Sequence, residues 1–118
     1  MENNKKIVVQ KLKKPVSDNY ACAEKYYSLL SSLNDLKLTT REIQLIAFTA
    51  IKGNISYANI REEFCAKYSS SGPTINNLIS KLKRMKIFIK DGSKIKINPI
   101  ISLAFDNDVV LQITITHG

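Results

Sequence analysis

The spacing of the apolar residues changes after Met85, and this change constrains the fold more than any other feature of the chain. Before it, apolar residues recur at intervals of three and four, at Ile75, Leu78, Ile79, Leu82 and Met85. After it isoleucines recur at every second position, at Ile87 and Ile89 and again at Ile95 and Ile97, with lysines among them. The first pattern is typical of an amphipathic helix, and an Asp-Gly pair at residues 91–92 between alternating segments strongly favours a hairpin. The sequence therefore predicts an α+β fold in which a helix leads directly into a β-hairpin.

Two further helices are predicted near the start of the chain. Ser17 or Asp18 can cap a first helix that ends at Asn34 and Asp35. Its apolar positions are Ala23, Tyr26, Tyr27, Leu30 and Leu33. The second helix should cover residues 40–52, because Thr39 and Glu42 have the spacing of a capping box and Gly53 suits the left-handed stop. The residues expected to face the core are Ile43, Ile46, Ala47, Ala50 and Ile51.

A third helix and the start of a fourth follow. Ser56 is a reasonable cap for the segment 57–68. The buried stripe expected in that segment is Tyr57, Ile60, Phe64 and Tyr68. Ser71 can cap the fourth helix, and Pro73 suits its first position, where a missing N–H costs nothing. The order is thus helix, turn, helix and hairpin.

The net charge of +8 is unevenly distributed along the 118 residues. Residues 81–98 carry seven basic residues against Asp91 alone, and residues 1–14 carry five lysines against Glu2. A basic surface favours polyanions, since each neutralised phosphate releases counterions. Lysine is also a common solubilising residue, so charge by itself leaves both readings open.

From about Leu38 to Pro99 this order of elements resembles the winged helix-turn-helix domains of bacterial and phage regulators, with MarR-like features. The resemblance implies a winged-helix domain over residues 17–99, with an additional helix at 18–34 and a core at 38–99. A basic arm or strand at residues 1–16 and a strand extension at residues 100–118 would flank it. The expected fold is mainly α, with a hairpin wing and short terminal strands.

The resemblance also implies which residues would contact double-stranded DNA. In such domains the recognition helix lies in the major groove with its first turns nearest the bases. The exposed residues there are Thr74, Asn76, Asn77 and Ser80. The residues placed for phosphates are Lys81, Lys83 and Arg84, with Lys90, Lys94 and Lys96 on the wing. Asn pairs well with adenine, and Arg84 is the helix's one arginine and comes late, so we expect modest, AT-leaning or shape-based recognition.

No catalytic, cofactor or metal site is expected. The chain has one histidine, His117, and its two cysteines, Cys22 and Cys65, lie in helix-like segments without a histidine nearby. No apolar run approaches the roughly 20 residues of a membrane span, and the first residues do not resemble a signal peptide. We expect a non-enzymatic protein of the cytoplasm of a bacterium or a phage-infected cell.

The two ends of the chain support an alternative. Lys6–Leu12 and Val109–Thr116 both have strand-like sequences. They could pair with each other, or with further copies or other protein chains, because an unpaired strand edge accepts another strand. The chain would then be a structural adaptor in a large assembly such as a phage virion.

Overall fold

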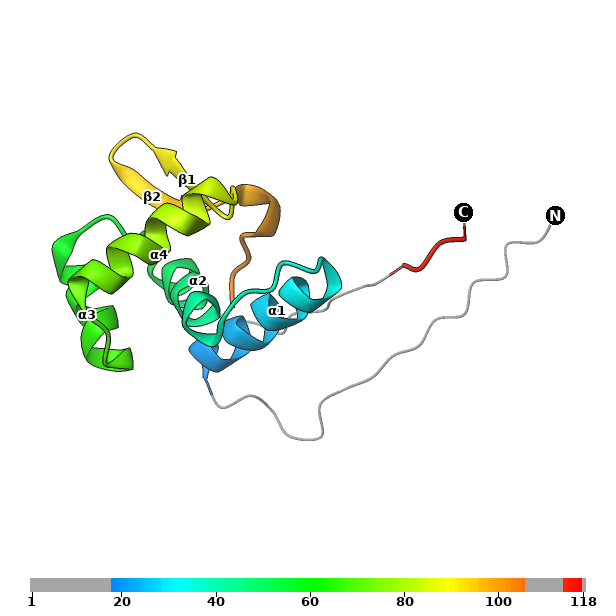
Figure 1. Cartoon of the computed structure of the whole chain (residues 1–118), viewed down its shortest axis with the longest axis horizontal. Helices are drawn as coiled ribbons and strands as arrows, with labels where there is room; N and C mark the ends of the chain where they lie inside the picture. The colour runs from blue at the N-terminus through cyan, green and yellow to red at the C-terminus, as the bar shows by residue number, and fades with distance from the viewer. Residues whose placement is uncertain (1–17, 106–113, 118) are drawn as a thin grey trace.

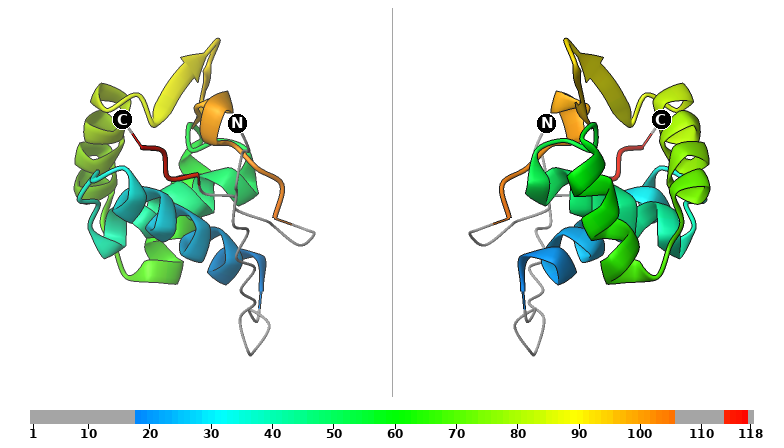
Figure 2. Two further views of the ribbon diagram at one scale, coloured as in Figure 1. Left: turned by 90° about the vertical axis from the view of Figure 1, so that its right-hand side faces the viewer. Right: turned by 90° about the vertical axis from the view of Figure 1, so that its left-hand side faces the viewer.

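The computed structural model describes residues 18–105 and 114–117, and its elements confirm the predicted α+β class (Figure 1). Four helices are followed by an antiparallel hairpin and a short 3-10 turn. Their bounds are α1 Asn19–Leu33, α2 Thr40–Lys52, α3 Ala58–Tyr68, α4 Gly72–Arg84, β1 Phe88–Asp91, β2 Lys94–Ile97 and η1 Pro99–Ile101. In both views of Figure 2 the hairpin projects beyond the helices at one end of the molecule.

The ends of α1 and α2 lie where local capping chemistry predicts. The Asp18 carboxylate accepts the Ala21 backbone N–H at 2.7 Å, and α1 stops before Asn34. The capping box at the start of α2 is complete, since Thr39 and Glu42 each accept the other's backbone N–H. Gly53 ends α2 with a φ of +93°. All these boundary predictions are confirmed.

The helix α2 is the centre of the core. Of its predicted core residues Ile46 and Ala47 are fully buried, while Ile43, Ala50 and Ile51 are partly buried. Other residues of α2 are also fully buried: Leu45, Phe48 and Thr49. The buried surface is wider than one stripe because α1, α3 and β2 all pack against this helix.

The start of α3 differs from the prediction. The helix begins at Ala58, and Ser56 does not cap it. Instead the Ser56 hydroxyl oxygen accepts the backbone N–H of Ile95 in β2. Tyr57, predicted to be buried, is 45% exposed because it precedes the first turn of the helix. Phe64 is fully buried, and Ile60 and Tyr68 are partly buried.

The hairpin is confirmed, with its turn one residue later than predicted. Asp91 pairs with Lys94 across the two strands, so the loop residues are Gly92 and Ser93 rather than Asp91 and Gly92. Gly92 has a φ of +62°, which glycine adopts without strain at the first position of a tight hairpin turn. The other cross-strand pairs are Phe88 with Ile97, Ile89 with Lys96 and Lys90 with Ile95.

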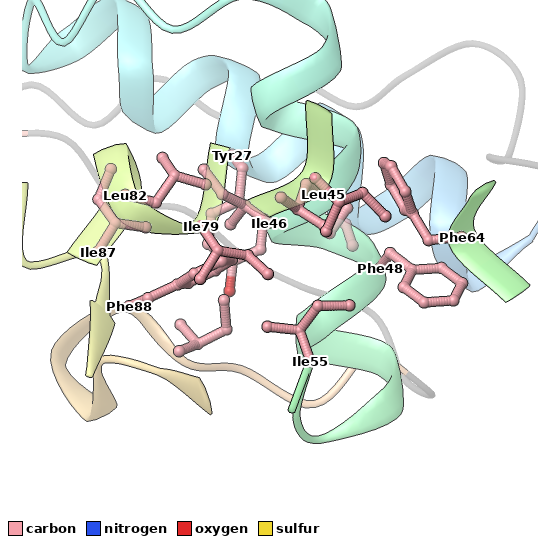
Figure 3. Packing of buried hydrophobic residues seen from close by; sticks show 14 of the residues in the cluster. Tyr27, Leu45, Ile46, Phe48, Ile55, Phe64, Ile79, Leu82, Ile87 and Phe88 are labelled. Carbon is pink, nitrogen blue, oxygen red and sulfur yellow. The ribbon is translucent and has the colours of Figure 1, made fainter. Parts of the chain in front are cut away.

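Side chains from the helices and from the hairpin region meet in one core (Figure 3). The hairpin region contributes three buried side chains to this core, those of Ile87, Phe88 and Ile97. The end of η1 lies against α1, where the Tyr27 hydroxyl donates to the Ile101 carbonyl at 2.8 Å. The hairpin is therefore anchored at its base while its tip remains exposed.

The predicted terminal strands are for the most part not described. Residues 1–16, which include Lys6–Leu12, lie outside the described residues, as do residues 109–113 of the strand predicted over Val109–Thr116. Residues 114–116 are described, are exposed and form part of no strand. Among residues 18–105 and 114–117, the two strands that pair are β1 and β2.

Candidate nucleic-acid interface

The orientation of α4 is fixed by its apolar face. Ile75, Ile79 and Leu82 are buried, as predicted. Leu78 and Met85 pack partly against the same cluster. The opposite face exposes the four predicted base-reading residues, which are Thr74, Asn76, Asn77 and Ser80.

The first turn of α4 is capped by Ser71. Its hydroxyl accepts the Thr74 backbone N–H at 3.4 Å and donates to the Thr74 hydroxyl oxygen at 2.8 Å. Gly72 occupies the first helical position, so Pro73 lies at the second rather than the first. The Thr74 hydroxyl is therefore partly engaged in the cap, and its methyl group is the part left for an apolar contact.

Asn76 is bound by a residue that sequence reasoning missed. Arg61 in α3 donates from Nη1 to the Asn76 Oδ1 atom at 2.8 Å. No pattern in the sequence indicates this contact, because the two residues are 15 positions apart and meet only when α3 packs on α4. Asn77 is exposed and makes no side-chain hydrogen bond within the described part of the chain.

Lys81 is held by a buried carboxylate. Its Nζ atom lies 2.6 Å from Oε2 of Glu42, a side chain that is 1% exposed. Burial acts to raise the pKa of the Glu42 carboxyl, but hydrogen bonds from Lys81 and Thr39 outweigh it and hold that pKa below its usual value. Lys81 therefore joins α4 to α2, and it is less available to a phosphate than the sequence predicted.

Part of the positive charge of the hairpin is also neutralised. Lys96 lies 2.7 Å from the Asp91 carboxylate, and its hydrogen bond lowers the pKa of Asp91. Lys90 and Lys94 are exposed, and neither has an ion-pair partner among the described residues. Of the three predicted wing contacts, these two are the better placed for a ligand.

The exposed positive charge continues along the chain from α4 into the hairpin. Lys83 and Arg84 are exposed at the end of α4, and Lys86, which the sequence did not single out, is exposed in the turn before β1 with a φ of +64°. In the part of the chain that the structure describes, none of the three has an ion-pair partner. With Lys90 and Lys94 they form what we call the free basic set: Lys83, Arg84, Lys86, Lys90 and Lys94.

The described residues contain neither a cluster of metal ligands nor a helix that could span a membrane. Across residues 18–105 and 114–117, no cluster of three His, Cys, Asp or Glu side chains could hold a metal ion. No helix in these ranges combines the length and the apolar character needed to cross a bilayer.

No protein-family model matches the chain, and no curated protein or solved structure shows detectable similarity to it.

Proposed function

We propose that this protein is a winged-helix protein that binds double-stranded DNA through α4 and the hairpin, as a small bacterial or phage transcriptional regulator. The observation that carries the proposal is that α4 exposes amide and hydroxyl side chains near its start and, at its end, cations without an ion-pair partner among the described residues, next to a basic hairpin. The first group suits base edges and the second suits phosphates.

The dimensions of α4 suit the major groove. The helix has 13 residues, which gives a length of about 20 Å at about 1.5 Å per residue. A three-residue turn, Ser69 to Ser71, separates it from α3, in keeping with a helix-turn-helix. Because the apolar face of α4 is buried, the helix can enter a groove only with the face that bears Asn76 and Asn77.

The proposal is tested by the salt dependence of duplex binding. If three to five members of the free basic set contact phosphates, log affinity should fall against log salt with a slope of about −3 to −4.5. The double charge reversal Lys90→Glu with Lys94→Glu should reduce that slope by about 2 and weaken all duplexes nearly alike.

A matched control is available on α1. Lys25 is exposed on the first helix, so Lys25→Glu makes the same charge reversal at one residue, half of the total change in the hairpin variant, outside α4 and the hairpin. It should leave the slope within about 0.5 of the original value, because it removes no phosphate contact. Equal slopes for the hairpin variant and the original chain would refute the proposal.

A structural adaptor is a second candidate, favoured by exposed apolar side chains. Leu29 and Leu33 lie one helical turn apart on α1 and are 45% and 50% exposed, and Ile100 in η1 is 89% exposed. Such side chains can serve a protein contact. This function predicts self-association or partner association that is lost when residues 109–116 are removed, together with weak duplex binding. Sedimentation of the full and truncated chains, with and without duplex, distinguishes the two.

A further inference from the structure

The Arg61 side chain bridges α4 and the loop before α3. Its Nε atom donates to the Ile55 carbonyl at 2.8 Å, and its Nη1 atom donates to Asn76 Oδ1 at 2.8 Å. Ile55 is fully buried. The guanidinium is thus fixed at one end by the protein interior and meets Asn76 at the other.

The loop that holds Arg61 is itself bound to the hairpin. The Ile55 N–H donates to the Ile95 carbonyl at 2.9 Å, and the Ile95 N–H donates to the Ser56 hydroxyl. A continuous series of hydrogen bonds therefore runs from β2 through residues 55–56 and Arg61 to Asn76. A side chain held in this way keeps one orientation when a ligand approaches, which lowers the entropy cost of binding.

The bond from Arg61 determines which atoms Asn76 presents. A guanidinium can only donate, so the Asn76 amide must turn its oxygen toward Arg61, which leaves the NH₂ group for a ligand. A free asparagine recognises adenine by donating to N7 and accepting from the N6 amino group. Here the Asn76 oxygen already accepts from the positively charged Arg61. Its second hydrogen bond to adenine, in which it would accept from the N6 amino group, is therefore disfavoured.

We infer that Arg61 holds the Asn76 amide so that its NH₂ group, a hydrogen-bond donor, selects guanine at the base pair facing Asn76. This inference rests on the proposed function and names one element of its specificity. Guanine presents two acceptors, N7 and O6, in the major groove, whereas cytosine presents a donor. Asn76 is the base-contacting residue and Arg61 is a positioning residue.

The test is a double-mutant cycle on the full chain with a duplex obtained by selection from a random pool at fixed salt. Asn76→Ala identifies the base pair, as the position at which preference is lost. Guanine should be favoured there by the original chain by about 5- to 100-fold. Arg61→Met should lose the same preference at that pair alone, and the double variant should lose no more than either single change.

A second variant reverses the chemistry. Asn76→Asp replaces the outward donor with an acceptor at an exposed position, so the fold should be retained. This variant should favour cytosine, whose amino group donates, over guanine on the same strand. Circular dichroism melting of each variant checks that folding is intact before affinities are compared.

The possible failures are separable. If Arg61→Met weakens all duplexes alike and lowers the salt slope by about 1, Arg61 contacts a phosphate and the inference is wrong. If Arg61→Met still binds duplexes and keeps the guanine preference, the positioning role is wrong while the proposed function stands. The same conclusion follows if the losses of guanine preference in the two single variants add up in the double variant. A chain that binds no duplex at low salt overturns the proposed function and this inference together.

Discussion

Replacing Lys81 with methionine should destabilise the protein, because it leaves the buried carboxylate of Glu42 without its cation. Glu42 is 1% exposed, and its two oxygens are used by Lys81 at 2.6 Å and by the Thr39 N–H at 2.8 Å. Breaking a buried ion pair by removing one partner costs about 3–5 kcal/mol. The Lys81 side chain is 45% exposed, and the hydrogen bond from the Thr39 N–H remains in the variant. We therefore expect Lys81→Met to lower the free energy of unfolding by about 1–3 kcal/mol.

The assay is chemical unfolding followed by far-ultraviolet circular dichroism, repeated from pH 7 to pH 3. In the folded protein the pKa of Glu42 is lowered, so the ion pair's stabilisation is present above the usual titration range of a glutamate. That stabilisation is lost as pH falls below about 4–5 and through the lowered pKa. The difference in free energy of unfolding between the original chain and Lys81→Met should therefore become smaller as the pH falls.

Two further variants make the reasoning refutable. Glu42→Gln combined with Lys81→Met should recover part of the loss, because a neutral amide can still accept the Thr39 N–H without leaving a buried charge. Lys83→Met is the control, since Lys83 is exposed on the same helix and lies in no ion pair among the described residues. It should cost less than about 0.5 kcal/mol. Equal losses in free energy of unfolding for Lys81→Met and Lys83→Met would show that the Glu42–Lys81 pair does not contribute to stability.

Two remaining predictions concern the core of α4 and the base of the hairpin. Leu82 is fully buried, so Leu82→Ala should cost about 2–5 kcal/mol through lost burial and a cavity; an unchanged melting temperature would contradict its placement. Ser56→Ala removes the acceptor of the Ile95 N–H and should cost about 1–2 kcal/mol. Hydrogen exchange should then be faster at Ile95, and equal rates in the two proteins would show that the Ser56 hydroxyl does not hold β2.

The sequence predicted those parts of the fold that depend on neighbouring residues. The capping box of α2, the Gly53 stop and the apolar face of α4 follow from local spacing, and each was found. The predictions for the position of the hairpin turn and for the role of Ser56 were wrong. Both depend on which backbone groups of β1 and β2 meet their partners, and spacing along the chain does not determine that.

The candidate site was predictable only in outline. Periodicity placed Thr74, Asn76 and Asn77 on the exposed face of α4, as found. It could not separate Lys81 and Lys96, which have acidic partners in the fold, from Lys83 and Lys94, which have none among the described residues. Arg61 was missed because its two partners lie six and fifteen residues away and come together only through tertiary packing.

The return of the chain to α1 after the hairpin has a consequence for the order of folding during synthesis. The Tyr27 hydroxyl bonds to Ile101, 74 positions later, and Phe105 packs against the rings of Tyr26 and Tyr27. Contacts between such distant positions form late, because the intervening chain must first be ordered. While a ribosome is still making residues 99–105, α1 can pack on α2 but leaves two tyrosine rings uncovered. We therefore expect this aromatic cluster to close among the last contacts of the domain, and a chain stalled before Ile101 to leave those rings open to chaperones.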